Sequence, residues 1–139
     1  MEYTLRRLDT TDYDRFLPLI HQFRATTFTR DEFIETVNYM KTHSDIWVVE
    51  HEGALIGTAT IIYERKFIFN LCKLAHIEDV CVAESYRRKG VGKLLLHKLL
   101  DEAKAHKCYK VTLDCATTNI PFYTACGLEV RGTQMTKLL

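Results

Sequence analysis

The fold is decided by the stretch Arg87-Arg88-Lys89-Gly90-Val91-Gly92-Lys93, which joins two segments with different apolar patterns. Before it, residues 74–82 are rich in branched apolar side chains, which is typical of a buried β-strand. After it, residues 91–106 carry apolar side chains at helical spacing with polar side chains outside them. The apolar positions are Val91, Leu95, Leu96, Leu99, Leu100 and Ala103. The quoted stretch is therefore expected to form the turn between a strand and a long helix.

A second strand pattern, over residues 109–115, follows the helix and completes a strand–helix–strand unit. Such a crossover nearly always joins parallel strands with a right-handed sense. Beyond it, the sequence predicts a short helix over 119–126, closed by Gly127, and one or two last strands from Leu128 onward. The C-terminal half is thus expected to build the parallel corner of a sheet.

The N-terminal half predicts helices and antiparallel strands. Thr29 and Glu32 have the spacing of a capping box, which marks the start of a helix. The expected elements are a strand over 3–8, a helix that begins near residue 10 or 11, a loop over 24–28, a helix to about Lys41, a β-hairpin over 46–50 and 55–63, and the strand over 74–82. We therefore expect one domain over 1–139, of the α/β or α+β class, with helices on both faces of a mixed sheet.

Size and composition match a single soluble domain. The chain has 139 residues and a mass of 16.2 kDa, with 47% hydrophobic and 27% charged residues, which excludes a mainly disordered or collagen-like chain. The net charge of +1 gives no reason to expect a nucleic-acid or membrane partner. No apolar run approaches the ~18 residues of a membrane span, and the first residues lack a secretion signal, so we expect a cytoplasmic protein.

The cysteines and histidines do not have the spacing of a metal site. The five cysteines form no C-x-x-C pair, and the six histidines form no H-x-x-x-H pair. Reduced, mostly buried thiols and no bound metal are therefore expected.

The turn at 87–93 has the features of an anion-binding site. Two glycines one residue apart let the backbone approach a ligand closely, and the free N–H groups of a first helical turn attract phosphate. The stretch is neither a Walker A loop nor a dinucleotide fingerprint, because neither glycine pattern is complete. From these residues alone, a flexible turn with solvated basic side chains remains an open alternative.

Five segments in order, across residues 64–123, resemble the GNAT superfamily of N-acetyltransferases. The resemblance is closest to glucosamine-6-phosphate N-acetyltransferases, and residues 1–45 match them only loosely, chiefly at Ala25-Thr26-Thr27. The segments are Glu64-Arg65-Lys66-Phe67-Ile68, His76-Ile77-Glu78-Asp79-Val80, Arg87 to Leu96 with its form [Q/R]-x-x-G-x-[G/A], Cys108 to Cys115, and Asn119-x-x-Phe122-Tyr123.

The resemblance implies that acetyl-CoA is the co-substrate and that the sheet is mostly antiparallel, with strands 74–82 and 109–115 splayed apart around the pantetheine arm. Tyr123 is then the general acid that protonates the departing thiolate, and the Val80 N–H is a candidate oxyanion donor. The alternative for Tyr123 is an aromatic side chain packed under a surface helix. The implied coenzyme-binding residues are Val80, Val82, Arg87, Arg88, Lys89, Gly90, Val91, Gly92, Lys93, Asn119 and Tyr123.

Three carboxylates are candidates for contacting the acceptor amine. Glu78 and Asp79 are adjacent on an otherwise apolar strand, so their side chains are expected on opposite faces, with at least one in a cleft or an interface. The resemblance assigns this pair to the sugar's amine and hydroxyl groups, and assigns Asp114 to orienting the amine or helping to deprotonate it. Surface salt bridges are the alternative for all three. Whether one of them or a water molecule acts as the base stays open.

The resemblance also implies a binding site for the sugar phosphate, in which lysine and hydroxyl groups are suitable donors. Two departures affect this site: Phe69 stands where the related enzymes often carry histidine, and the chain ends in Lys137-Leu138-Leu139 where they often have arginine. Lys137, Arg65 or Lys73 are candidate replacements. The implied substrate-binding residues are Thr26, Lys66, Phe67, Ile68, Phe69, Glu78, Asp79, Val80, Tyr109 and Lys110.

The resulting hypothesis is an enzyme that acetylates glucosamine 6-phosphate on the route to UDP-N-acetylglucosamine, as a homodimer whose sugar site uses both subunits. One alternative keeps the fold and co-substrate but makes the acceptor a protein N-terminus, a lysine or another small amine. A second is a non-catalytic acyl-CoA-binding regulator, against which the presence of Tyr123 argues.

Overall fold

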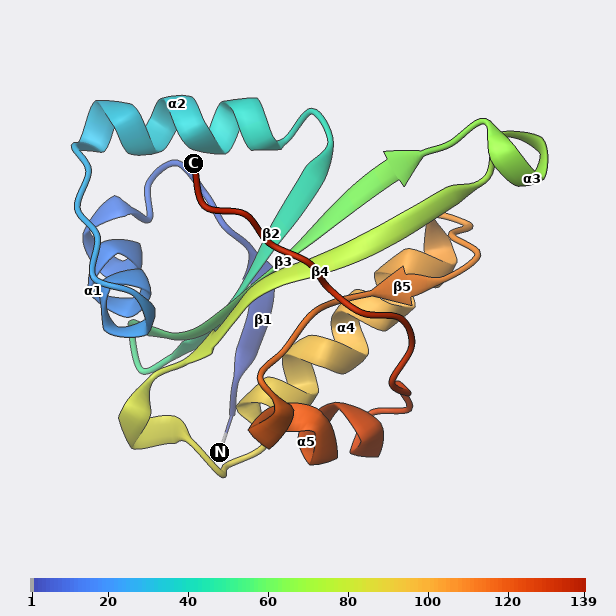
Figure 1. Ribbon diagram of the computed structural model, residues 1–139. Coiled ribbons are helices and arrows are strands. Elements are labelled where there is room, and N and C mark those ends of the chain that lie inside the picture. Colours follow the sequence, from blue (N-terminus) through green and yellow to red (C-terminus); the bar gives the residue numbers. More distant parts are fainter. Residues whose placement is uncertain (1) are drawn as a thin grey trace.

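The computed structural model describes residues 2–139 and contains helices and strands that alternate along most of the chain (Figure 1). In chain order they are β1 (Thr4–Arg7), α1 (Tyr13–Phe23), α2 (Arg30–Met40), β2 (Ser44–His51), β3 (Ala54–Arg65), α3 (Ile68–Leu71), β4 (Lys73–Val82), the 3₁₀ turn η1 (Glu84–Tyr86), α4 (Val91–Ala105), β5 (Val111–Thr112), the 3₁₀ turn η2 (Thr117–Asn119) and α5 (Ile120–Ala125).

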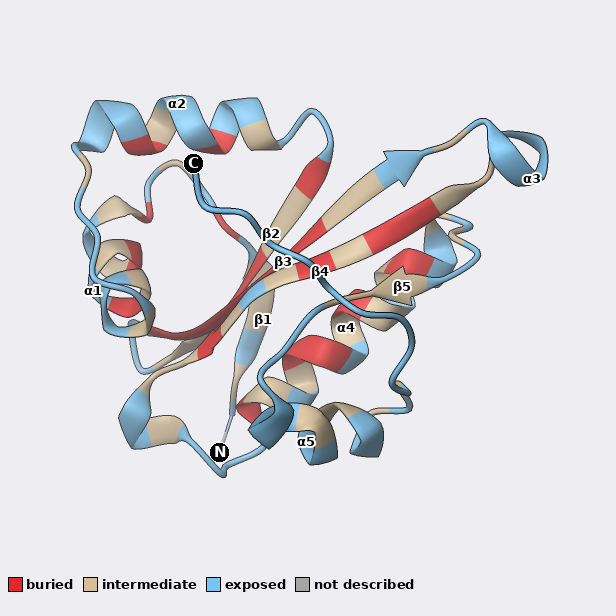
Figure 2. Ribbon diagram, in the orientation of Figure 1, coloured by how far each residue is buried: buried red, intermediate tan, exposed pale blue. Residues whose placement is uncertain are grey.

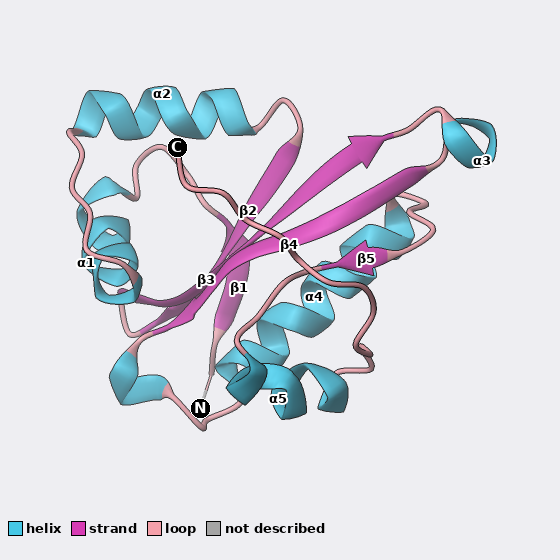
Figure 3. Ribbon diagram, in the orientation of Figure 1, coloured by secondary structure: helices cyan, strands magenta, loops and turns pink. Residues whose placement is uncertain are grey.

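The strands form one sheet in the order β1-β2-β3-β4-β5. The first three pairings are antiparallel, and β4 pairs with β5 in parallel. Helices α1 and α2 cover one face, whereas α4 and α5 lie on the other (Figure 3). The predicted class, a mixed and mostly antiparallel sheet with a parallel β4–α4–β5 corner and helices on both faces, is confirmed.

Each face of the sheet has its own apolar core, and Figure 2 shows the buried residues of the chain in red. On one side, Leu95, Leu96 and Leu99 of α4 are completely buried against the sheet. On the other side, Phe16 and Leu19 of α1 pack with side chains of α2 and the sheet. Full burial of one such side chain stabilises the fold by about 2 kcal/mol relative to exposure. The two cores therefore fix α1 and α4 on opposite sides of β3 and β4, the strands that both helices contact.

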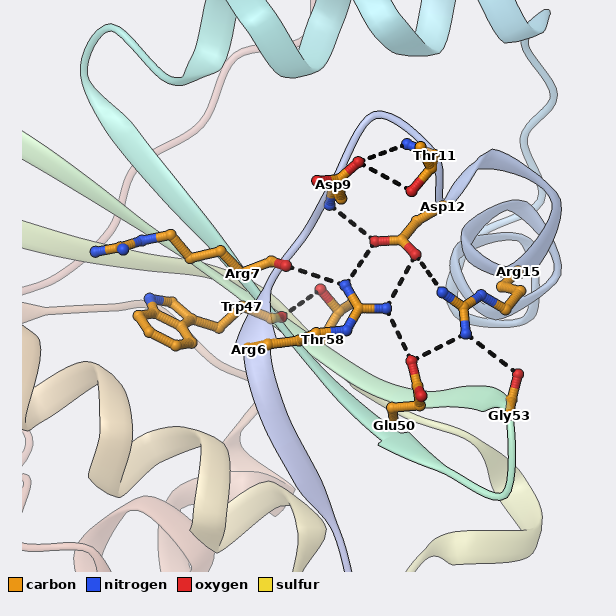
Figure 4. Close-up of polar contacts among 10 residues, drawn as sticks. All are labelled: Arg6, Arg7, Asp9, Thr11, Asp12, Arg15, Trp47, Glu50, Gly53 and Thr58. Carbon is orange, nitrogen blue, oxygen red and sulfur yellow. Dashed lines mark hydrogen bonds and ion pairs between the residues drawn. The ribbon is translucent and has the colours of Figure 1, made fainter.

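The start of α1 is fixed by a buried carboxylate (Figure 4). Asp12 is 0% exposed and accepts hydrogen bonds from Arg6 of β1, at 2.8 and 3.0 Å, and from Arg15 of α1, at 2.6 Å. Glu50 of β2 accepts from the same two guanidinium groups, at 2.9 Å each. These contacts tie α1 to the edge of the sheet. The start of α2 carries the predicted capping box between Thr29 and Glu32.

Two expectations for the C-terminal half are wrong. The strand expected over 109–115 is confined to Val111–Thr112, because β5 pairs with β4 only at these two positions before the two strands diverge. The strands expected from Leu128 onward do not form, and residues 129–139 are exposed. A strand needs a neighbouring backbone, and within residues 2–139 no strand pairs with this segment.

The five cysteines are free thiols, but the expectation that most are buried is wrong, since only Cys81 is buried and Cys115 is exposed. Over residues 2–139, no helix combines the length and apolar character that crossing a membrane requires.

Candidate active site

A gap opens between β4 and β5 toward the C-terminal end of β4. The two strands are paired only at Ala75 with Val111 and His76 with Thr112. Beyond this point β4 continues to Val82 along β3, whereas the segment that follows β5 turns away into η2 and α5. The expected splaying of the parallel pair is therefore present, and it leaves one edge of β4 without a strand over about half its length.

A β-bulge at Asp79 determines which backbone groups of β4 face this gap. The β3–β4 register shifts there, so that Thr60 pairs with Glu78 but Thr58 pairs with Cys81. Before the bulge, the Ala75 N–H donates to Lys110 of the β5 segment, and after it the Ala83 N–H donates to Ile56 of β3. The backbone N–H and C=O groups of the odd-numbered residues of β4 thus point toward β5 before the bulge and toward β3 after it.

It follows that the backbone groups of Val80 and Val82 face the gap, where an extended ligand could bind as an added strand. Their side chains pack in the core beside α4, as do those of Ala75 and Ile77 before the bulge. This geometry supports the two valines as coenzyme-binding candidates. The bulge, with Asp79 at φ 53°, also interrupts the regular alternation from which Glu78 and Asp79 were expected on opposite faces.

The turn before α4 has a conformation that suits an anion. Arg88 and Gly90 adopt positive φ angles of 61° and 84°. At Gly90 an added Cβ would meet no atom within 4 Å, so glycine is favoured there by the backbone conformation rather than by space. The first intrahelical bond is donated by the Leu94 N–H to the Gly90 carbonyl. The N–H groups of Val91, Gly92 and Lys93 therefore precede the helical ladder.

Four cationic side chains flank these N–H groups: Arg87, Arg88, Lys89 and Lys93, all exposed. A helix N-terminus with its dipole and nearby cations is suited to phosphate or pyrophosphate. The coenzyme-binding candidates from 87 to 93 are thus brought together at one end of α4, next to the open edge of β4.

Gly92 has a role that the sequence did not indicate. A Cβ at this position would lie 3.2 Å from the Phe122 Cζ and 3.7 Å from a Val82 methyl group. The glycine therefore lets α5 approach the first turn of α4, whereas the sequence suggested only a close approach to phosphate. Phe122 is the neighbour of Tyr123, and their rings meet edge to face at 4.9 Å. Phe122 is part of the motif Asn119-x-x-Phe122-Tyr123, but the motif did not predict its contact with the first turn of α4.

Tyr123 is half-buried on α5 and packs against the core beside α4. Asn119, the other candidate from this region, lies exposed at the N-terminus of α5. Burial, followed by the nearby thiols of Cys115 and Cys126 and the Asp114 carboxylate, raises the pKa of the Tyr123 phenol. At neutral pH the phenol is therefore protonated and has a proton to donate.

The acidic candidates influence one another. Burial raises the pKa of Glu78, and the negative charges of Asp114 and Asp79 raise it further. Asp114 is exposed just beyond β5 and acts electrostatically on both Tyr123 and Glu78. The structure thus brings together a phenol from α5, a carboxylate from β4 and a carboxylate from the segment just beyond β5. A carboxylate with a raised pKa is a better proton acceptor near neutral pH.

His76 is a neighbour of this cluster that sequence reasoning did not assign. It precedes Glu78 by two residues on β4, before the bulge, and its Nε2 lies 3.0 Å from Oε1 of Glu64 on β3. Burial raises the pKa of Glu78, whereas the interaction with His76 lowers it and so offsets part of the effect of burial. The i, i+2 spacing from Glu78 was the available sequence feature.

The phosphate-binding candidates fall into two groups. Phe67, Ile68 and Phe69 are exposed at the tip of the β3–β4 hairpin, where the Phe69 ring lies 5.6 Å from the ring of Tyr109. Lys66 begins the tip, its N–H donating to the Cys72 carbonyl, and the Lys110 ammonium lies over the Tyr109 ring. These residues are brought together.

Thr26 belongs to a second group. It lies in the α1–α2 loop, where the His21 Nδ1 approaches its N–H and its carbonyl oxygen. That loop and the α3 tip lie on opposite sides of Figure 1, so one chain does not bring Thr26 to the hairpin tip. In residues 2–139, no group of three or more His, Cys, Asp or Glu side chains could hold a metal ion.

Comparison with known proteins agrees with this architecture. The chain is 35% identical to glucosamine 6-phosphate N-acetyltransferase of Arabidopsis thaliana, over 97% of this chain and 95% of the relative. It is 34% identical to glucosamine 6-phosphate N-acetyltransferase 1 of Dictyostelium discoideum, over 95% and 88% of the two chains. The crystal structure of the Arabidopsis thaliana enzyme superposes with a TM-score of 0.95 at 34% identity, covering 99% of each chain.

The profile of the acetyltransferase (GNAT) family matches residues 5–128, which include the sheet, the α4 turn and Tyr123. The resemblance inferred from the sequence is thereby confirmed. The chain belongs to the acetyltransferase (GNAT) family.

Proposed function

We propose that this protein transfers the acetyl group of acetyl-CoA to the 2-amine of D-glucosamine 6-phosphate, giving N-acetylglucosamine 6-phosphate and coenzyme A. The observation that carries the proposal is the open edge of β4 beside the cationic N-terminus of α4, with Tyr123 of α5 packed against the core next to α4. The enzymes named glucosamine 6-phosphate N-acetyltransferase match nearly the whole chain, which supports this acceptor.

The turn before α4 fits the coenzyme's phosphates. The N–H groups of Val91, Gly92 and Lys93 would bind the pyrophosphate, with Arg87, Arg88 and Lys89 supplying positive charge. The backbone groups of Val80 and Val82 would bind the pantetheine arm in the β4–β5 gap. Asn119 lies at the start of α5, on the same side of the gap as Tyr123.

Acetyl-CoA supplies a thioester carbonyl that an amine attacks directly while both substrates are bound. The residues of the chain then have four tasks. The Val80 N–H would stabilise negative charge on the carbonyl oxygen, and Tyr123 would donate its proton to the leaving sulfur. Glu78, whose pKa is raised, would accept the proton of the amine, and Asp114 and Asp79 would orient the sugar.

The sugar phosphate site is proposed to need two subunits of a homodimer. Lys66, Tyr109 and Lys110 gather near the hairpin tip, whereas Thr26 lies across the molecule, so a second copy would bring the two groups together. Phe67 and Phe69 at the tip are 91% and 72% exposed, which is unusual for large apolar side chains unless another surface covers them. Arg65, Lys73 or Lys137 would replace the missing histidine and arginine.

The cellular role is proposed to be the supply of N-acetylglucosamine 6-phosphate for UDP-N-acetylglucosamine in the cytoplasm. All five cysteines are free thiols, as is usual in a reducing compartment.

A thiol-release assay tests the proposed activity. Purified protein is mixed with acetyl-CoA and, in turn, with glucosamine 6-phosphate, glucosamine and a lysine-containing peptide. We expect glucosamine 6-phosphate to give the highest kcat/KM. Equal rates with glucosamine would refute the phosphate assignment, and a preference for the peptide would support the alternative acceptor class.

A further inference from the structure

The turn that precedes α4 is attached to the end of β2 by Tyr86. The Tyr86 hydroxyl lies 2.7 Å from the Nδ1 of His51, the last residue of β2. The two rings meet edge to face at 5.4 Å, and the Tyr3 ring contacts both, at 5.4 and 6.5 Å. Tyr86 is the residue immediately before Arg87, with which the cationic stretch begins.

The same turn has further anchors at its beginning. The Ala83 N–H donates to the Ile56 carbonyl of β3, and the Glu84 N–H donates to the Gln22 side chain of α1, at 2.6 Å. From Arg87 to Gly90, by contrast, all residues are exposed, and the backbone includes the positive φ angles of Arg88 and Gly90. Tyr86 is therefore the last side-chain anchor before the exposed residues, while α4 holds their other end.

The ring of Tyr86 also acts on the cationic stretch directly. The Lys89 ammonium lies over this ring, 5.4 Å from its centroid. A cation over an aromatic face is attracted by the ring quadrupole, so the ring position influences where this charge is held. The tyrosine thus restrains both the backbone before Arg87 and one of the cations that follow it.

We infer that Tyr86 and His51 are positioning residues for the phosphate-binding turn, and that they hold it in the conformation that binds the coenzyme's phosphates. The inference rests on the proposed function. Neither residue is required to touch the coenzyme. Loss of the hydroxyl contact would let the turn sample conformations that cannot bind phosphate, and apparent affinity falls with the fraction of molecules that are competent.

The test compares variants that remove the contact with one that preserves it. Tyr86→Phe removes only the hydroxyl, and His51→Leu removes its partner. His51→Gln keeps a side-chain hydrogen-bonding group. Tyr39→Phe is the matched control, because Tyr39 is 63% exposed on α2. Circular dichroism and thermal melting verify that each variant is folded. Calorimetry then gives Kd for coenzyme A, and inhibition kinetics give the constant for pantetheine, which lacks the phosphates.

We expect Tyr86→Phe and His51→Leu each to raise Kd for coenzyme A about three- to tenfold, the effect of losing one hydrogen bond. The pantetheine constant, kcat at saturating acetyl-CoA and KM for the sugar phosphate should stay within about twofold of wild type. His51→Gln should bind coenzyme A more tightly than His51→Leu. The double variant Tyr86→Phe/His51→Leu should bind no worse than His51→Leu alone, because both substitutions remove the same hydrogen bond.

Two outcomes would overturn the inference. One is wild-type affinity for coenzyme A in folded Tyr86→Phe and His51→Leu. The other is an equal loss of affinity for coenzyme A and pantetheine, which would indicate a general structural effect. Failure of the wild-type protein to bind coenzyme A would instead refute the proposed function, so the two failures are distinguishable.

Discussion

At the scale of single residues, burial sets the protonation states on which the proposed chemistry depends. It raises the pKa of both Tyr123 and Glu78, and Asp114 adds to both shifts. The phenol consequently stays protonated at neutral pH, while the carboxylate becomes a stronger base. The same environment thus favours one group that gives a proton and another that accepts one.

The first prediction concerns the proton donor. Tyr123→Phe removes the hydroxyl but keeps the ring that packs beside α4, so the fold and the coenzyme site should persist. We expect kcat to fall about 10²-fold, with Kd for coenzyme A nearly unchanged. Steady-state kinetics and calorimetry measure the two quantities. Wild-type turnover in the variant would exclude Tyr123 as the acid.

The second prediction concerns the proton acceptor. Glu78 must be ionised to accept a proton, so kcat/KM should fall as pH drops through its raised pKa. Asp114→Asn removes a negative charge that contributes to the raised value, so this acidic limb should move to lower pH. Glu78→Gln should lower kcat and abolish the limb. A limb that stays in place in both variants would belong to the substrate amine, and Glu78 would not be the base.

The third prediction concerns stability at low pH. Burial of Asp12 favours its neutral form, but hydrogen bonds from Arg6, from the Asp9 N–H and from Arg15 outweigh this and lower its pKa from 3.8 to about 2 (Figure 4). A carboxylate with a lowered folded-state pKa stabilises the fold above its unfolded pKa. The stabilisation should be fully present above about pH 5 and be lost as the pH falls toward 2.

Replacement of this carboxylate provides the corresponding test. Asp12→Asn leaves Arg6 and Arg15 with only Glu50 as an acidic partner, and we expect a loss of about 3 kcal/mol in the free energy of unfolding at pH 7. Denaturant unfolding at several pH values measures it. The difference between the two proteins should shrink at acidic pH, and a difference that is constant with pH would contradict the assigned cause.

At the scale of the elements, the sequence predicted whatever depends on local pattern. The periodicity of residues 91–106 and the capping box at Thr29 located α4 and α2 to within about two residues. The length of β5 was not predictable, because it depends on where β4 diverges from it. The bulge at Asp79 was not predicted, although the apolar positions that pack beside α4 change there from odd numbers, Ala75 and Ile77, to even numbers, Val80 and Val82.

In the candidate site, too, the sequence predicted the local motifs but not the contacts between distant segments. The cationic turn and Tyr123 were identified from short motifs, because the motif residues are neighbours in sequence. The contacts between Gly92 and Phe122, and between Tyr86 and His51, join residues that are distant in sequence. Such contacts depend on how the elements pack, which no local pattern encodes.

The fourth prediction concerns the packing of α4 on α5. Gly92→Ala would place a Cβ 3.2 Å from the Phe122 ring, so this ring, which is partly exposed, must shift and disturb Tyr123. We expect kcat to fall about fivefold, a small overpacking effect. Phe122→Leu should provide the missing space, so the double variant should match Phe122→Leu alone. An additive loss in the double variant would argue against this contact as the cause.

At the scale of the whole molecule, the described chain leaves large apolar and backbone groups exposed. The hairpin tip extends from the body of the protein with Phe67 and Phe69 exposed, and residues 129–139 lie along the surface without pairing to a strand. A single chain also keeps Thr26 far from the hairpin tip. All three features favour a homodimer in which each acceptor site takes residues from both copies.

The fifth prediction tests this arrangement by complementation. If a site combines Tyr123 of one copy with the hairpin tip of the other, two impaired proteins can restore activity when they exchange subunits. Tyr123→Phe and Lys66→Ala are each expected to be impaired alone. Heterodimers of the two contain one site in which both residues are intact, and random mixing should restore about a quarter of wild-type activity.

The control for complementation is a mixture that is assayed before subunits can exchange. Its activity should equal the mean of the two variants and then rise toward the predicted quarter during incubation, while sedimentation analysis shows dimers throughout. If Tyr123 and Lys66 serve a site within one chain, every site in the mixture keeps one defect and the activity stays at that mean. A constant mean would show that Tyr123 and Lys66 of one chain serve the same site. A protein that sediments as a monomer while fully active would show that one copy is sufficient.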